Sequence, residues 1–263
     1  MMFKKCAILY YGGDIHYNRV LSKIRHEGLS FNNILQYFYY SILEPLIWRA
    51  AHCNFSPSTE ELNIISIINR NSYLLPVRLF FSFPKKSYKR LNDNLLFLFV
   101  GGAGHLPNKD ALEYIDEEII DAYLKAFGNK FEILVVGRGW EKFESKNRGK
   151  NLNILGSVSD ATLEKLYQTV DFSLCPLRFG AGVKGKVIES MYYSVPVITS
   201  PIGKQGIECP FLVSHIDIPS QIKYIKKLKN DELLLQSTLK GYSDFLTKNY
   251  SGSRIRDIIM DSI

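Results

Sequence analysis

Short apolar runs alternate with amphipathic stretches along the last two thirds of the chain. The stretches at 109–127 and 160–169, and one that begins near 183, have the apolar spacing of helices. The runs between them have the length of buried strands: LLFLFVGG, FEILVVGR, LNILGSV, DFSLCPL and PVITSP. Strands that alternate with helices form right-handed βαβ units, whose parallel sheet is covered on both faces. The pattern predicts a Rossmann-like α/β fold, followed by a helix at 231–247 and a final short helix in RIRDIIMDSI.

The first 90 residues hold fewer strand signals. Candidate strands lie in CAILYY, HCNFS and SYLLPV, and a long aromatic amphipathic helix is predicted at about 33–50. PSTEELNIISII has the serine-to-glutamate spacing that caps a helix. These strands are too few for a complete doubly wound domain, and FFSFPKKSYKRLNDN, with its proline and charge run, is the predicted linker. We expect a partial α/β domain with its linker at 1–90 and a Rossmann-like domain at 91–263.

The composition is that of a globular protein. The 263 residues are 46% hydrophobic and 22% charged, which excludes disordered and fibrous classes. No apolar run approaches the roughly 20 residues of a membrane-spanning helix, and the apolar stretch after MMFKK is too short for a signal peptide, so we expect a cytoplasmic protein. The cysteines lack CxxC spacing, which favours buried thiols over disulfides or a zinc site: Cys6, Cys53, Cys175 and Cys209.

The first third of the chain holds the whole excess of positive charge. Residues 1–90 contain 12 Lys and Arg against 5 Asp and Glu, whereas residues 91–263 contain 21 of each kind. This basic segment, which includes aromatic residues 37–40 and Trp48, is suited to an anionic membrane surface, an acidic acceptor or a partner chain. The protein would then lie at the inner face of the membrane. A solvated basic face over an aromatic core accounts for the same pattern, and we expect no nucleic-acid partner.

Residues 176–201, PLRFGAGVKGKVIESMYYSVPVITSP, are the most informative segment of the chain. They are typical of a strand end, a glycine-rich turn, a helix and another strand. Three glycines let the backbone approach a ligand closely: Gly180, Gly182 and Gly185. The unpaired amides at the start of the following helix point toward an anion, and Lys184 and Lys186 add positive charge. Glu189, on the first turns of that helix, is suited to accept hydrogen bonds from sugar hydroxyls, which favours a nucleotide or nucleotide sugar.

Two other interpretations of this segment remain open from the residues alone. The glycines are also typical of a tightly packed strand-to-helix connection, with both lysines on a solvated face. A nicotinamide-dependent dehydrogenase shares the Rossmann-like pattern. The dehydrogenase is disfavoured because no GxGxxG follows the first strand with an acid about 20 residues later, and because the phosphate turn comes late in the sheet.

From residue 95 onward the chain resembles the GT-B nucleotide-sugar glycosyltransferases, specifically the large retaining group called glycosyl transferases group 1 or family 4. The motifs that establish the resemblance follow one another in the order of that family: FVGGAGHLPNKDALEYIDEEI, VVGRG, ILGSVSD, LEKLYQTVDFSLCPLRFGAGVKGKVIESM and PVITSPIGKQGIE. The resemblance implies transfer of a sugar from a nucleotide sugar to a glycan or lipid-linked acceptor with retention of configuration. It also implies a hexosyltransferase-type enzyme of polysaccharide biosynthesis that needs no metal cofactor.

The resemblance also implies a role for each residue of the donor site. Lysines and the turn from Arg178 to Gly185 grip the diphosphate, Arg138 approaches it, the backbone around Val158 receives the base, and Glu189 takes the ribose hydroxyls. The implied donor-binding residues are Gly102, Gly137, Arg138, Val158, Arg178, Gly180, Gly182, Val183, Lys184, Gly185, Lys186 and Glu189. The family usually has a second glutamate eight positions before Glu189, where this chain has Ala181, and this departure concerns the identity of the donor sugar.

The amino-terminal segment departs further from the family. GGDIHYNR resembles the acceptor-side motif, with Gly13 where many members have histidine and with Asp14, His16 and Arg19 as polar candidates. We take four residues as catalytic candidates: Asp14, His16, Arg138 and Lys184. Several strands of the family's acceptor domain have no counterpart here. The alternative function is therefore a nucleotide-sugar-binding module that is catalytically weak without a partner chain.

Overall fold

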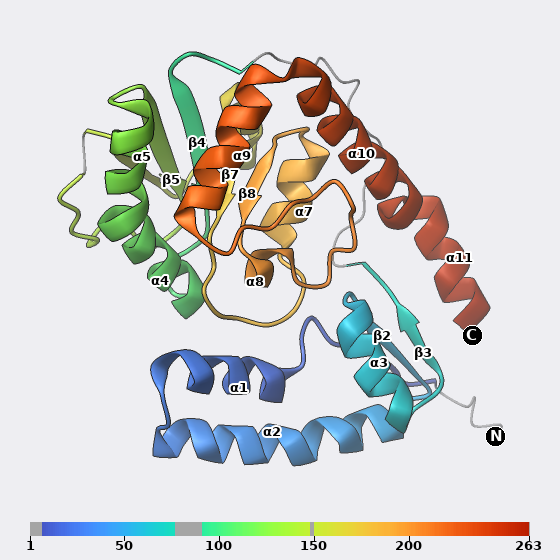
Figure 1. The fold of residues 1–263 in the computed structure, drawn as a ribbon. Helices are drawn as coiled ribbons and strands as arrows, with labels where there is room; N and C mark the ends of the chain where they lie inside the picture. Colours follow the sequence, from blue (N-terminus) through green and yellow to red (C-terminus); the bar gives the residue numbers. More distant parts are fainter. Residues whose placement is uncertain (1–6, 77–90, 148–149, 263) are drawn as a thin grey trace, which may run out of the picture.

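A computed structural model describes residues 7–76, 91–147 and 150–262, which fold around two parallel sheets (Figure 1). The predicted linker at 80–94 lies mostly outside the described residues. The smaller sheet uses the elements up to residue 74, and the larger sheet uses those from residue 95 onward. The Rossmann-like fold class that the sequence predicts is present from residue 95. The boundary predicted at 90/91 stays a prediction.

The smaller sheet has the strand order β1-β2-β3, with all pairs parallel. Its strands are β1 (Leu9–Tyr11), β2 (Cys53–Ser56) and β3 (Ser72–Leu74). Helices α1 (His16–Glu27) and α2 (Phe31–Ala50) connect β1 to β2, and α3 (Thr59–Ile68) connects β2 to β3. The hydroxyls of Ser30 and Ser58 cap α2 and α3 by accepting the N–H of the residue three positions later. Figure 1 shows α2 on the far side of α1 from the larger sheet.

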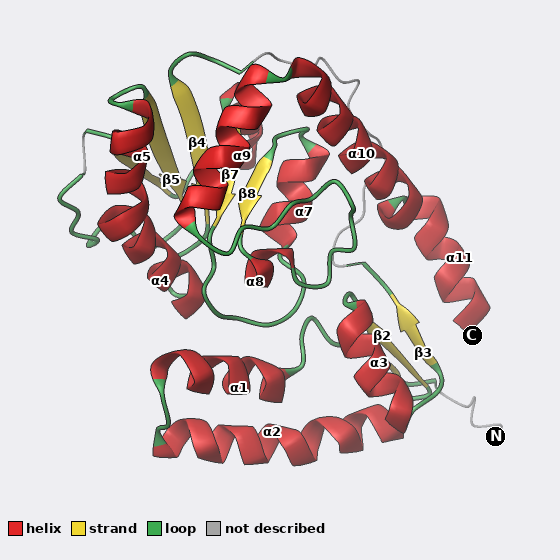
Figure 2. Cartoon of the chain, in the orientation of Figure 1, coloured by secondary structure: helices red, strands yellow, loops and turns green. Residues whose placement is uncertain are grey.

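The larger sheet has the strand order β6-β5-β4-β7-β8 and is parallel throughout. Its strands are β4 (Leu95–Val100), β5 (Phe131–Val136), β6 (Leu152–Gly156), β7 (Phe172–Cys175) and β8 (Val197–Thr199). The helices around it, drawn in red in Figure 2, are α4 (Leu106–Tyr114), α5 (Ile120–Phe127), α6 (Asp160–Thr169), α7 (Gly185–Tyr192), α8 (Pro201–Lys204), α9 (Ile218–Asn230) and α10 (Glu232–Tyr250). The last helix, α11 (Gly252–Ser262), follows α10 and lies beside β3 of the smaller sheet.

Strand β4 shows how the sheet separates its two faces. Alternate side chains of a strand point to opposite faces, and Leu95, Phe97 and Phe99 lie in one buried cluster with residues of α4, α5, α9 and α10. Leu98 lies in a second cluster together with residues of α6. The ring of Phe97 stacks on Phe172 at 5.3 Å between centroids. Helices therefore cover both faces, and the binding surface is left to the ends of the strands.

Two helical features differ from the sequence prediction. The helix predicted at 109–127 begins at Leu106 and contains a π-helical turn, Ile115–Ile119, between α4 and α5. Helix α9 was not predicted, and its sequence, IPSQIKYIKKLKN, is rich in lysine and has a proline at the second position. Its start is nevertheless capped, since the carboxylate of Asp217 accepts the N–H of Ser220 at 2.7 Å. In the described part of the chain, no helix has the length and apolar character needed to cross a membrane.

The close approach of the β4 and β5 ends yields a test of the fold. Gly137 has φ 153°, and a Cβ added there would overlap the backbone of Gly101. We predict that Gly137→Ala lowers the free energy of unfolding by about 2 to 4 kcal/mol through backbone strain. Gly104→Ala is the matched control, because its Cβ would meet no atom within 4 Å, and it should change stability by less than about 0.5 kcal/mol. Urea denaturation measures both, and equal stabilities would contradict the packing described here.

Candidate functional site

Three loops meet at the carboxyl ends of β4, β5 and β7. The first two are tied together by backbone and indole contacts: Ala103 N–H donates to the carbonyl of Arg138 at 2.9 Å, and the indole N–H of Trp140 donates to the carbonyl of Gly101 at 2.6 Å. The backbone of Gly102 also lies against that of Arg138, since a Cβ added to Gly102 would be 3.4 Å from the carbonyl oxygen of Arg138. The predicted residues Gly102, Gly137 and Arg138 are thus brought together.

Asn108 joins the loop after β4 to helix α7, which follows the loop after β7. Its amide nitrogen donates to the carbonyl of Gly102 at 3.1 Å, and its Oδ1 accepts the Nζ of Lys186 at 2.6 Å. Asn108 is buried at the start of α4, behind Pro107 in the first turn. The sequence motif Pro-Asn-x-Asp therefore has a structural role: it fixes the ammonium group of Lys186 beside the turn at Gly102.

Both lysines of the glycine-rich turn are turned inward. Lys184 is only 8% exposed, and its Nζ donates to the carbonyls of Ala181, at 2.9 Å, and Gly182. Burial lowers the pKa of Lys184 to about 8 and also lowers the pKa of Lys186, whose Nζ lies 4.9 Å from the ring centre of Phe99. The alternative of two lysines on a solvated face is therefore wrong. Two cations held in a partly dry crevice are suited to an anionic ligand.

Arg178, at the start of the turn, is held by an acid on α4. Its Nη2 and Nε donate to the two oxygens of Asp110 at 2.5 and 3.0 Å, and the Nε2 of His26 lies 3.0 Å from the same carboxylate. Burial raises the pKa of Asp110, but the hydrogen bonds from Arg178 and His26 outweigh it, and the pKa stays below its ordinary value. This group links α1, α4 and the turn.

The turn also packs directly against the amino-terminal segment. Gly180 N–H donates to the hydroxyl of Ser22 on α1 at 3.1 Å. Gly182 has φ 70°, and a Cβ added there would lie 2.8 Å from the Cβ of Asp14. Gly185, the first residue of α7, has open space where a Cβ would be. The structure thus places the predicted residue Asp14 beside the turn.

The other amino-terminal candidates, Arg19 and His16, have partners within the amino-terminal elements. Arg19 forms an ion pair with Asp14 at 3.2 Å. The ring of His16 contacts the buried carboxylate of Glu44 at 2.9 Å and stacks on Tyr40 at 4.9 Å between centroids. Glu44 also accepts the backbone N–H of His16 at 2.8 Å, which fixes the first turn of α1. His16 is therefore oriented by α2 and contacts it directly.

Sequence analysis missed Glu61, a buried acid close to the turn. Its carboxylate accepts the N–H of Ile15 at 3.1 Å and the hydroxyl of Ser56 at 3.4 Å. Burial raises the pKa of Glu61 to about 7, with Asp14 and Lys184 both close enough to affect it. The available signal was the capping spacing Ser58-x-x-Glu61. Ser58 does cap α3, but the glutamate reaches across to the segment before α1 instead of closing the capping box.

The residues predicted to bind the nucleoside lie on the other side of α7. Glu189 accepts the hydroxyl of the buried Tyr167 at 3.4 Å. Val158, at the end of β6, packs against the cluster that contains Tyr167. Val183 precedes the start of α7. Its side chain lies against Gly206, since a Cβ added to Gly206 would be 2.7 Å from a methyl group of Val183. Tyr167 thus brings Val158 and Glu189 toward each other.

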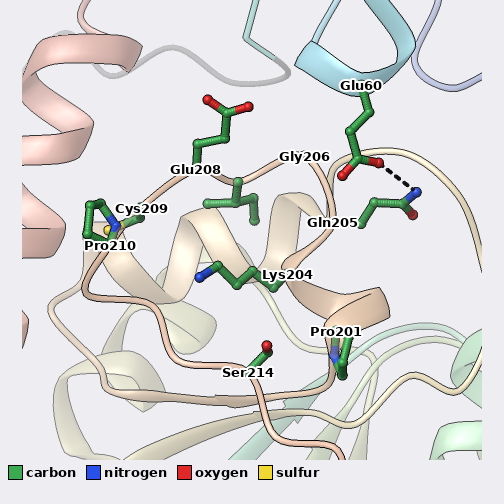
Figure 3. A pocket seen from close by; sticks show the side chains of 10 residues that line it. Glu60, Pro201, Lys204, Gln205, Gly206, Glu208, Cys209, Pro210 and Ser214 are labelled. Carbon is green, nitrogen blue, oxygen red and sulfur yellow. Dashed lines mark hydrogen bonds between the residues drawn. The ribbon is translucent and has the colours of Figure 1, made fainter.

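A pocket of about 450 Å³ lies beyond the turn, where α3 approaches the segment after β8 (Figure 3). The amide of Gln205 donates to Glu60 at 3.3 Å, which forms a further link between the amino-terminal elements and the part of the chain that forms the larger sheet. Gly206, Lys204 and Ser214 also line this pocket. Within residues 7–76, 91–147 and 150–262, no group of three or more His, Cys, Asp or Glu side chains is arranged to hold a metal ion.

Comparison with known families agrees with this geometry. Residues 94–231, more than half of the chain, match the family model described as glycosyl transferases group 1. The chain belongs to the glycosyl transferases group 1 family. The matched region includes all three loops of the crevice and both lysines of the turn. No curated protein matches the chain significantly.

Solved structures share the fold of this family member. S. aureus TarM superposes with a TM-score of 0.69 at 14% identity, over 98% of this chain and 51% of TarM. Sucrose-phosphate synthase from Thermosynechococcus elongatus gives 0.66 at 15% identity, over 94% and 64%. Anabaena HepE, solved with UDP and glucose, gives 0.67 at 12% identity, over 97% and 71%. These likenesses confirm the GT-B-type Rossmann-like fold, and the chain spans about half the length of TarM.

The buried Lys184 should make stability depend on pH. Its pKa is about 8 in the folded chain, against the ordinary lysine value of 10.5 in the unfolded chain. The unfolded chain therefore binds more protons between these pH values, and stability rises with pH there. From pH 8 to 9.5 the gain from this one group is about 1 to 2 kcal/mol. Urea denaturation should show this rise in the wild type and in the exposed control Lys109→Met, and a smaller rise in Lys184→Met. Equal rises in all three would contradict the buried position of Lys184.

Proposed function

We propose that the chain transfers a hexose from a nucleoside diphosphate sugar to a glycan or lipid-linked acceptor with retention of configuration. The proposal places it among the family 4 enzymes of polysaccharide biosynthesis. One observation carries it: the buried Lys184, the partly buried Lys186 and the first amides of α7 meet the loops after β4 and β5 at one end of the sheet. Ligands of doubly wound sheets bind at this end of the strands.

The proposed diphosphate site uses Lys186, Lys184 and the amino terminus of α7. Lys186 is aimed by Asn108, and α7 begins at Gly185 with unpaired amides that favour an anion. Preorganised cations and amides stabilise the charge that develops on the departing diphosphate. We therefore assign Lys184 and Arg138 to leaving-group stabilisation and propose that no metal cofactor is required.

The proposed nucleoside site lies between α6 and α7. Glu189 accepts the ribose hydroxyls, and the backbone at Val158 receives the base. The hydroxyl of Tyr167 donates to Glu189 and holds the carboxylate in place before the ligand arrives. TarM and HepE were both solved with bound UDP, which supports a uridine nucleotide as the first donor to test.

Asp14 is the proposed catalytic carboxylate on the acceptor side, because it lies beside Gly182 and faces the turn. His16 is kept as a candidate, and its contact with Glu44 makes orientation of the segment before α1 its first role to test. We assign Arg178 a positioning role. Its bidentate ion pair with Asp110 on α4 holds the segment that connects β7 to the glycine-rich turn.

Helix α2 supports the proposal that turnover needs a partner chain. Its inner face buries Asn33, Glu44 and Trp48, while its outer face is apolar. The six outer side chains are each more than half exposed: Phe31, Leu35, Phe38, Tyr39, Ile42 and Leu46. Such an apolar stripe on a helix is normally covered.

Two observations favour a protein over a membrane as the cover. Residues 7–76 contain five Lys and Arg and five Asp and Glu, so the basic excess of the first third lies outside the described residues. In the described part of the chain, β1 has a neighbour on one side only, and its outer edge offers backbone groups that another strand would satisfy. We propose a partner chain that meets α2 and the edge of β1.

Donor binding is the first test of the proposed function. Calorimetry with a panel of nucleoside diphosphate sugars should find a ligand whose affinity is unchanged by EDTA. Glu189→Ala should weaken its binding by about 1 to 3 kcal/mol, because a charged acceptor for hydroxyls is lost. Glu164→Ala, an exposed glutamate on the neighbouring helix α6, is the matched control and should bind like the wild type. Metal-dependent binding, or equal loss in both variants, would contradict the assignment.

Turnover tests the need for a partner. Transfer from a radiolabelled donor by the purified chain alone should be far slower than the roughly 1 to 10³ s⁻¹ of ordinary enzymes, although the donor binds. Orientation of donor and acceptor by two surfaces supplies a large part of the rate. In the described residues, the outer face of α2 and the edge of β1 are uncovered. Ordinary turnover by the monomer, or binding of α2 to anionic vesicles that Ile42→Glu abolishes, would contradict the proposal of a protein partner.

A further inference from the structure

A second pocket lies on the amino-terminal side of the glycine-rich turn. It has a volume of about 270 Å³ and is enclosed by α1, α2, the segment Gly104–Pro107 and the ring of Phe179. Phe179 immediately precedes Gly180, and its ring stacks on His26 at 4.5 Å between centroids. The hydroxyl of Ser22, on α1 between two residues of the pocket lining, accepts the N–H of Gly180. The pocket is therefore adjacent to the proposed donor site but separated from it by one aromatic side chain.

The polar lining of this pocket contains two cations and, among the described residues, no acid. Arg19 and Lys23 line it together with the neutral amide of Gln36 and the imidazole of His105. The nearest acids hold these cations only loosely: Lys23 and Glu27 are 3.7 Å apart as an exposed helical pair, and Arg19 meets Asp14 at 3.2 Å while nearly half exposed. Burial and the positive charges of Lys186, Arg19 and Lys184 lower the pKa of His105, which indicates how closely the cations converge.

The remaining walls of the pocket are apolar or aromatic. Tyr40 and Phe179 contribute rings, and Val20, Leu106 and Pro107 contribute aliphatic surface. A few convergent polar groups within apolar walls are typical of small-molecule sites. A ligand that carries an anionic group attached to an apolar group would match this lining.

We propose that this pocket recognises the acceptor through a phosphate ester whose alcohol portion is apolar. The inference rests on the proposed transferase function, since it names the class of acceptor that the chain would take beside its donor. Arg19, Lys23 and His105 bind the phosphate oxygens, while Tyr40 and Phe179 pack against the apolar portion. The position next to Gly180 brings a hydroxyl of a further group on the same phosphate to the donor side of Phe179. That hydroxyl oxygen would form the new bond to the donor sugar and lose its proton, while the bond from the sugar to the departing nucleoside diphosphate breaks.

Phenyl phosphate is the probe, titrated into the full chain with and without saturating UDP and followed by amide chemical shifts in nuclear magnetic resonance. We expect one site that remains in the presence of UDP, with shifts at Ser22, Gly104 and His105. Glycerol 3-phosphate and benzyl alcohol, which each lack one of the two features, should bind at least fivefold more weakly. Equal binding of either compound would overturn the proposed chemistry.

Three variants locate the site. Lys23→Ala should weaken phenyl phosphate binding at least fivefold, whereas Arg25→Ala, an exposed cation on the same helix outside the lining, should leave it unchanged. Gly104→Trp should abolish binding by filling the pocket, because the Cβ position of Gly104 is open. An equal effect of the Lys23 and Arg25 changes, or full binding by the tryptophan variant, would overturn the proposal.

Donor titrations separate this proposal from the proposed function. If UDP binds but phenyl phosphate does not, or if UDP or a UDP-sugar displaces it, the pocket belongs to the donor or to no ligand, and this inference alone fails. If no nucleoside diphosphate sugar binds the wild-type chain, the proposed function fails, whatever the pocket does. Binding of phenyl phosphate together with UDP supports both.

Discussion

The site depends on one amide side chain that holds two loops together. Asn108 donates to the carbonyl of Gly102 and accepts from the ammonium of Lys186, so it joins the loop after β4 to the helix after β7. A buried lysine without an acceptor would be costly, and the amide oxygen supplies that acceptor without cancelling the charge. The positive charge therefore remains available to an anion. The parallel sheet places the strand ends side by side, and Asn108 fixes the positions of the Gly102 backbone and the Lys186 ammonium group at that end.

A second constraint lies at the contact between the glycine-rich turn and the amino-terminal segment. The backbone of the turn meets Ser22 and Asp14, and Glu61 lies buried beneath it. Lys184 and Glu61 thus share a small volume, and burial, which disfavours both charged forms, lowers the pKa of the lysine and raises that of the acid, although the attraction between the two groups opposes both shifts. A bound anion would stabilise the charged form of Lys184. In the proposed function, the donor phosphates and the acceptor-side carboxylate of Asp14 would then lie on either side of Gly182.

The parts of the fold with strong local patterns could be predicted from the sequence. The strands from β4 to β8, the turn at 180–185 and the capped helix α3 follow from apolar runs, glycine and serine. The position of the Lys186 ammonium group could not be predicted, because it depends on Asn108, which lies 78 positions away in the chain. Glu61 was missed for the same reason, since its partner Ile15 is 46 positions away. Local chemistry predicts the elements, whereas such distant contacts decide which side chains face the crevice.

A crystal structure of the chain with bound UDP tests the central claim most directly, because it measures where the diphosphate lies. The account predicts phosphate oxygens within about 3.2 Å of the Nζ of Lys186 and of the first amides of α7, with the ribose hydroxyls on Glu189. A diphosphate bound in the pocket of Figure 3, or held without contact to Lys186 and α7, would contradict it.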